Sequence, residues 1–73
     1  MDKLIAVVFG IPADAVHDDL AFDDIATWDS LTHMQLITAL EDSYKVMLTG
    51  DEIADMRSVG AARAALRAHG VNA

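Results

Sequence analysis

The segment from Ser30 to Tyr44 constrains the fold of this chain most strongly, because it contains neither glycine nor proline and repeats apolar residues at helical spacing. Four residues form a stripe at positions i, i+1, i+4 and i+8: Leu36, Ile37, Leu40 and Tyr44. Such a stripe is typical of the core-facing side of an amphipathic helix. A strand at Val7 to Phe9 would find no partner strand for its backbone hydrogen bonds. The chain is therefore predicted to be all-α.

The N-terminal part of the chain combines a helix with a long loop. Residues Asp2 to Phe9 are predicted to form a helix that ends at Gly10, with Leu4, Ile5, Val8 and Phe9 at helical spacing. Residues Ala13 to Trp28 are predicted to form a loop pinned to the core by four irregularly spaced anchors: Val16, Leu20, Phe22 and Ile25. A structureless loop of this length is uncommon in a small domain, so it is either functional or contains a helical turn.

Two further helices follow in the C-terminal part. Thr49 and Glu52 match a capping box, which predicts a short helix from Gly50 to Asp55. Ser58 is the predicted cap of a last helix that runs through His69. Its inward residues are predicted to be Val59, Ala62, Ala65 and Leu66. The expected architecture is a single domain, residues 1–73, with three longer helices, one short helix and a long first loop.

The composition excludes several classes of function. The chain has 73 residues, 12 acidic residues against five Lys and Arg, and a net charge of −7, which makes binding to a phosphate backbone implausible. The absence of cysteine removes disulfides, thiolate metal sites and a cysteine nucleophile. No apolar run approaches the roughly 18 residues of a membrane span, and Met1 to Leu4 does not resemble a secretory signal. We therefore expect a cytoplasmic protein with basic partners.

No set of residues forms a convincing catalytic or metal site. The three histidines are far apart in sequence, and no metal-binding or phosphate-loop motif is present. Ser30, His33 and Asp29 could be written as a triad, but nothing supplies an oxyanion hole or a substrate cleft. His33 is instead predicted to lie at the rim of the core stripe. A second stripe mixes polar and apolar residues and should face solvent or a partner: Leu31, Gln35, Thr38 and Asp42.

The tripeptide Asp29-Ser30-Leu31 stands where the acidic loop meets the amphipathic helix. Taken alone it is an ordinary helix start, because Asp and Ser are preferred caps. Its context is more specific and resembles the acyl carrier proteins and their peptidyl and aminoacyl relatives. The resemblance rests on these strings: Trp28-Asp29-Ser30-Leu31, Leu36, Ala39-Leu40-Glu41-Asp42, Tyr44, Leu48, Asp51-Glu52-Ile53, Met56 and Ser58-Val59. It implies a four-helix acyl-carrier-like bundle.

The resemblance also implies a function. Ser30 would carry a 4′-phosphopantetheine arm derived from coenzyme A, with Asp29 and Leu31 beside it. Partner recognition would involve Leu31, Met34, Gln35, Thr38, Glu41, Asp42, Leu48, Asp51, Glu52, Asp55 and Met56. The implied partners are a phosphopantetheinyl transferase, an acyl- or aminoacyl-loading enzyme, and synthases or transferases with basic docking patches. The chain would be a monomeric carrier of thioester-bound intermediates and not an enzyme.

Departures from the family pattern bear on the pathway. Gln35 stands where bacterial fatty-acid carriers usually have Glu, and Thr38 replaces a more usual apolar residue. Together with Trp28, which lies two residues before Ser30, these departures favour a discrete carrier of polyketide or other specialised biosynthesis. The alternatives are an aminoacyl or peptidyl carrier and, in a different class, an unmodified acidic helical interaction module. Trp28 is expected either to anchor the loop in the core or to line the resting place of the arm or cargo.

Overall fold

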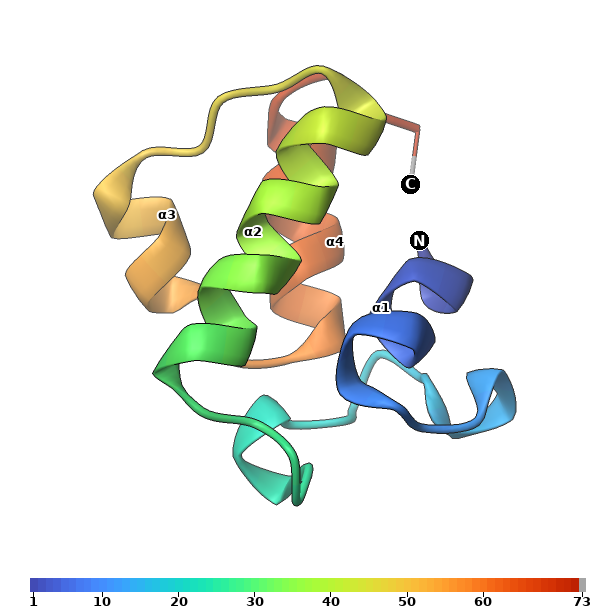
Figure 1. The fold of residues 1–73 in the computed structure, drawn as a ribbon. Coiled ribbons are helices and arrows are strands. Elements are labelled where there is room, and N and C mark those ends of the chain that lie inside the picture. Colours follow the sequence, from blue (N-terminus) through green and yellow to red (C-terminus); the bar gives the residue numbers. More distant parts are fainter. Residues whose placement is uncertain (73) are drawn as a thin grey trace.

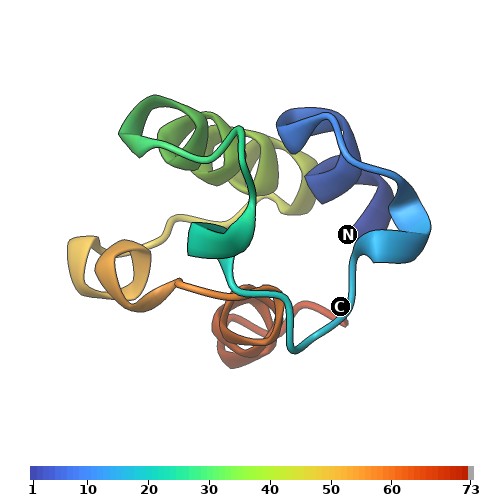
Figure 2. The same ribbon diagram turned by 90° about the horizontal axis from the view of Figure 1, so that it is seen from below.

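The computed structural model describes residues 1–72 and contains four α-helices (Figure 1). They are α1 (Asp2–Phe9), α2 (Ser30–Tyr44), α3 (Gly50–Asp55) and α4 (Val59–Ala68). Figures 1 and 2 show α1 and α3 on opposite sides of α2. Within residues 1–72 the only extended pairing is an isolated bridge between Ala21 and Ser58. The all-α prediction, with three longer helices and one short helix, is confirmed.

The helices begin and end where local chemistry dictates. The side chains of Asp29, Thr49 and Ser58 each accept a hydrogen bond from a backbone N–H in the first turn of their helix, which satisfies a donor that the helix cannot satisfy. At the other end of α1, Gly10 adopts a left-handed conformation with φ of 67°. The predicted bounds hold for the first three helices, while α4 ends at Ala68, one residue before the predicted His69.

The end of α2 has a backbone conformation that the sequence does not reveal. Lys45 has φ of 57°, a left-handed conformation that glycine usually occupies. Its backbone N–H and that of Val46 both donate to the Glu41 carbonyl oxygen. The Glu41 carboxylate also accepts the N–H of Leu48 at 2.9 Å. Glu41 therefore organises the turn after α2 through both its backbone and its side chain.

The long first loop contains two single helical turns, Ala13–Ala15 and Phe22–Asp24, which answers the alternative left open above. The loop is held by backbone hydrogen bonds to the beginning of α4. The Val59 N–H donates to the Leu20 carbonyl at 3.0 Å, and the Gly60 N–H donates to the Asp18 carbonyl at 2.9 Å. A Cβ at residue 60 would lie 3.0 Å from that same carbonyl oxygen, so this close approach favours glycine.

One hydrophobic core joins all four helices and the loop. Its fully buried large side chains are Ile5, Phe9, Phe22, Leu36, Ile37, Leu40, Met56, Val59 and Leu66. The predicted anchors Val16, Phe22 and Ile25 are buried, and Leu20 packs against the core. Tyr44 lies at the edge, partly buried.

Replacing Leu40, which has no exposed surface, with alanine should strongly destabilise the fold. Leu40→Ala should reduce the free energy of unfolding by about 2–5 kcal/mol, because it removes buried apolar area and leaves a cavity. Urea titration followed by circular dichroism measures this, with the exposed α2 variant Ser43→Ala as the control. A Leu40→Ala protein that melts within about two degrees of wild type would contradict the position of Leu40 in the core.

Candidate functional site

Ser30 is the first residue of α2 and is exposed. The preceding Asp29 is the cap, and its carboxylate accepts the Thr32 N–H at 2.8 Å. In return, the Thr32 hydroxyl oxygen accepts the Asp29 N–H at 2.8 Å. This reciprocal capping box fixes the start of the helix through Asp29 and Thr32, so the Ser30 hydroxyl is not needed as a cap.

The charge at this helix start is negative. The Thr32 N–H, followed by the Thr32 hydroxyl, lowers the pKa of Asp29 below its ordinary value. The helix dipole favours an anion here, and the exposed Ser30 hydroxyl offers the space that a phosphodiester needs. Because Asp29 already takes the Thr32 N–H, a phosphate on Ser30 would remain largely in water. The residues thus fit a surface-attached phosphopantetheine, which supplies a thiol that this chain lacks.

The capping role of Asp29 predicts a pH-dependent stability. Asp29→Ala should lower the melting temperature at neutral pH, whereas Asp29→Asn should retain most of it, because Asn is also a good cap. Since folding lowers the pKa of Asp29, its charged form stabilises the fold fully above the ordinary value of 3.8, and this stabilisation is lost as pH falls below it.

Melting curves of wild type and Asp29→Asn between about pH 7 and pH 3 test this expectation. The difference in melting temperature between the two proteins should change across the acidic end of this range. A difference that stays constant would show that the charge of Asp29 does not contribute.

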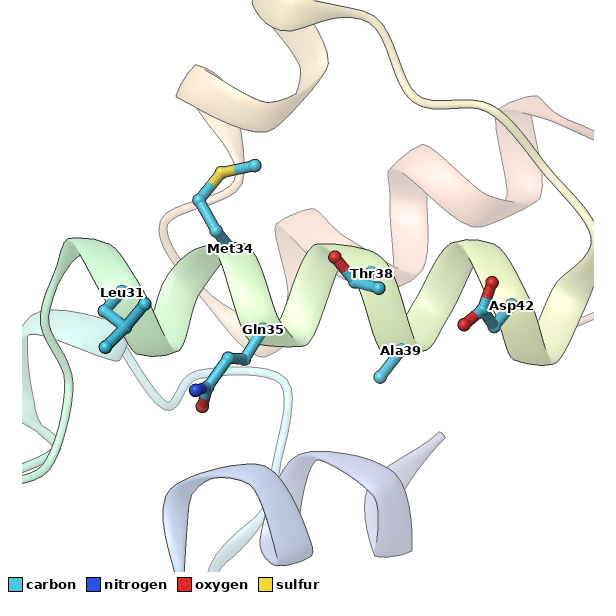
Figure 3. Close-up of a pocket in the computed structure, with 6 residues that line it drawn as sticks. All are labelled: Leu31, Met34, Gln35, Thr38, Ala39 and Asp42. Carbon is cyan, nitrogen blue, oxygen red and sulfur yellow. The ribbon is translucent and has the colours of Figure 1, made fainter.

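A shallow groove runs along the outer face of α2 from the Ser30 end (Figure 3). Six residues line it: Leu31, Met34, Gln35, Thr38, Ala39 and Asp42. Leu31 is 68% exposed and Met34 is 48% exposed, which is unusual for large apolar side chains. In Figure 3, Met34 points to the side of α3 and Gln35 to the side of α1. The structure thus brings together the four predicted recognition residues of the second stripe with Met34.

The remaining six predicted recognition residues divide into three groups: exposed acids, acids whose carboxylates are bound within the chain, and buried apolar residues. Asp51 and Asp55 are exposed on α3. The Glu41 and Glu52 carboxylates are engaged within the chain: Glu41 accepts the Leu48 N–H, while Glu52 accepts the Thr49 N–H at 2.9 Å and lies 2.9 Å from the His69 ring. The capping-box motif indicated this structural role for Glu52, whereas the sequence position of Glu41 did not indicate the bond to Leu48.

Leu48 and Met56 are corrections. Both were expected on the partner surface, but Leu48 is 9% exposed and Met56 is 1% exposed. Both side chains belong to the hydrophobic core. Both residues lie in short connecting segments. Their buried apolar side chains anchor these segments to the core, because a small domain offers a loop few other contacts.

His33 connects the site to α3 in a way that the sequence did not indicate. The Trp28 indole N–H donates to His33 Nδ1 at 3.3 Å, and His33 Nε2 lies 3.1 Å from the Ile53 carbonyl oxygen. An indole nitrogen only donates and a carbonyl only accepts, so both bonds require the neutral imidazole with its proton on Nε2. The ring also packs edge-on against Phe22. His33 therefore bridges the core, the loop and α3.

The structure supports the anchoring role of Trp28, while a role in holding the arm or cargo stays a prediction. Trp28 is partly buried against the core, and it also lines a small pocket between the loop, α2 and α3. The other pocket residues are Asp23, His33, Ile53, Ala54, Met56 and Arg57. A side chain in this position anchors the loop while it remains partly exposed.

Loading of Ser30 should therefore change the fluorescence of Trp28, the only tryptophan. The emission maximum is compared between unmodified and acylated protein, and Ser30→Ala in the same mixture is the control. Blue-shifted emission that does not respond to loading would restrict Trp28 to the anchoring role.

The comparisons with known proteins agree with this geometry. Residues 2–66 match the family model described as the phosphopantetheine attachment site. The chain is 38% identical over 51 residues to an acyl carrier protein from Beutenbergia cavernae, covering 70% of this chain and 62% of the relative. It is 32% identical over 58 residues to one from Acidothermus cellulolyticus, covering 80% and 69%. A third, from Kineococcus radiotolerans, is 33% identical and covers 70% and 63%. The chain thus spans less than two thirds of the length of the first and third of these relatives.

These matches define the class of protein: small helical carriers with a phosphopantetheine attachment site. The chain belongs to the acyl carrier protein family. Membership implies a 4′-phosphopantetheine prosthetic group. Among residues 1–72, no helix has the length and apolar character to cross a membrane. In the same residues, no cluster of three or more His, Cys, Asp or Glu could hold a metal ion.

Proposed function

We propose that this chain carries acyl groups as thioesters on a 4′-phosphopantetheine arm attached to Ser30 and delivers them to partner enzymes. The observation that supports the proposal best is the position of Ser30. It is an exposed serine at the first position of a long helix, and the Asp29–Thr32 capping box leaves its hydroxyl available. The domain supplies a rigid point of attachment, and the arm supplies the reactive thiol.

The proposed partners are a phosphopantetheinyl transferase, a loading enzyme and synthases or transferases that reach the arm. The net charge of −7 and the exposed acids Asp42, Asp51 and Asp55 support partners with basic patches. A field of one sign raises the rate of encounter with such partners. Gln35 and Thr38 on α2 favour polyketide or other specialised biosynthesis as the pathway.

Modification of Ser30 tests this function. Incubation with coenzyme A, Mg²⁺ and a broad-specificity phosphopantetheinyl transferase should increase the mass of the protein by one arm, as measured by intact-protein mass spectrometry. Ser30→Ala should show no increase. Ser43→Ala, a serine exposed on the same helix, is the matched control and should be modified like wild type.

A wild-type protein that stays unmodified while a known carrier is converted would contradict the proposal. Ser30 would then be only part of a helix start, and the acidic helical interaction module would be the better description. Attachment of an amino acid by an adenylating enzyme to the loaded arm would instead identify an aminoacyl carrier.

A further inference from the structure

The hydrogen bond between Trp28 and His33 exists in only one charge state of the imidazole. The Trp28 indole N–H donates to His33 Nδ1 at 3.3 Å, and the ring centroids lie 5.9 Å apart at an interplanar angle of 76°. Protonation of His33 would place an N–H at Nδ1, directed at an indole N–H that can only donate. This bond is therefore lost when His33 becomes a cation.

The other side of the imidazole does not respond to protonation in this way. His33 Nε2 lies 3.1 Å from the Ile53 carbonyl oxygen and carries the proton in the neutral ring. The cation keeps this N–H, so Nε2 donates to the same oxygen in both charge states. The link between α2 and α3 thus survives protonation, and the change is confined to the side of the loop.

The charged groups around the ring oppose one another. Asp23 from the loop and Arg57 from the segment after α3 line the same small pocket as His33, and their charges have opposite signs. The pocket residues from α3 are Ile53 and Ala54, which carry no charge. On α2 itself, the carboxylate of the capping residue, Asp29, is engaged with a backbone N–H. The conflict between two N–H groups at Nδ1 therefore decides the response.

The backbone on both sides of Trp28 is held by bonds that contain no imidazole. The Thr27 hydroxyl donates to the Phe9 carbonyl at 2.6 Å, and the Trp28 N–H donates to the Ile25 carbonyl at 3.0 Å. The next residue, Asp29, is fixed by its capping box. Loss of the indole bond therefore frees the side chain of Trp28 without releasing the chain around it.

We infer that Trp28 and His33 form a pH-sensitive latch, which is closed while His33 is neutral and opens when His33 is protonated. Opening releases the Trp28 ring from the pocket between the loop, α2 and α3. Histidine is the side chain that ordinarily changes charge between about pH 5 and pH 8. The closed latch needs the neutral ring, so it is present at the upper end of this range and is lost as the pH falls. The inference goes beyond the proposed function, because the latch needs no arm on Ser30.

The fluorescence of Trp28 reports the state of the latch, because Trp28 is the only tryptophan. A background protein with His17→Gln and His69→Gln keeps His33 as its only histidine. Between about pH 8 and about pH 5.5 its emission maximum should shift to longer wavelength, since the released indole is more exposed to water. Adding His33→Gln to this background should abolish the shift, because an amide does not titrate. Circular dichroism verifies that each variant is folded.

Nitrogen NMR of the imidazoles tests the latch in the wild-type protein without relying on a variant fold. At about pH 8 the His33 ring should be neutral with its proton on Nε2, and its titration should coincide with the change in Trp28 emission. A neutral ring that is protonated on Nδ1 would overturn the inference, because it could not accept the indole N–H.

The inference is also overturned if the emission of the background protein does not shift, or if the shift remains after His33→Gln. All these measurements use unmodified protein. Their failure would leave the attachment of an arm to Ser30 untouched, and an unmodified Ser30 would leave the latch untouched.

Discussion

The position of the proposed attachment site depends on the backbone hydrogen bonds that join the long loop to the beginning of α4. The Leu20 and Asp18 carbonyls accept N–H groups from Val59 and Gly60, and the Phe22 N–H donates to the Arg57 carbonyl. The loop thereby satisfies donors in the first turn of α4 that no helix can satisfy for itself. It also inserts Phe22 into the core, so the chain leaves the core at a defined place and reaches the start of α2 with Asp29 in capping position.

The sequence was sufficient for the helices because their signals are local. A capping side chain, the N–H it accepts and the apolar stripe all lie within a few residues of one another, as in the Thr49 and Ser58 caps. The course of the loop was not predictable in the same way. Its turns are fixed by bonds between residues about 40 positions apart, such as Asp18 with Gly60 and Asp18 with Arg63, and these leave no periodic trace in the sequence.

The candidate site shows the same difference between local sequence signals and contacts made by distant residues. Ser30, Asp29 and Leu31 were predicted as the site from a contiguous motif, and the structure places this motif at the start of α2. Leu48 and Met56 were misassigned because an apolar residue in a short segment can face either a partner or the core, and only the packing decides. The capping role of Thr32 was overlooked for a related reason, and His33 was predicted at the rim of the core stripe without its hydrogen bonds. The hydrogen bonds of His33 to Trp28 and Ile53 join three separate segments, and a lone helical histidine gives no indication of them.

Acidic residues in this chain serve two physical purposes that composition alone cannot separate. Asp29, Glu41 and Glu52 use their carboxylates to satisfy backbone N–H groups at the start of α2, after its end and at the start of α3. They still contribute to the long-range field, because a hydrogen-bonded carboxylate keeps its charge. Their short-range hydrogen-bonding capacity, however, is already partly used. The charge of these acids therefore acts over a distance, while the surface beside Ser30 is formed by the apolar side chains of Leu31 and Met34.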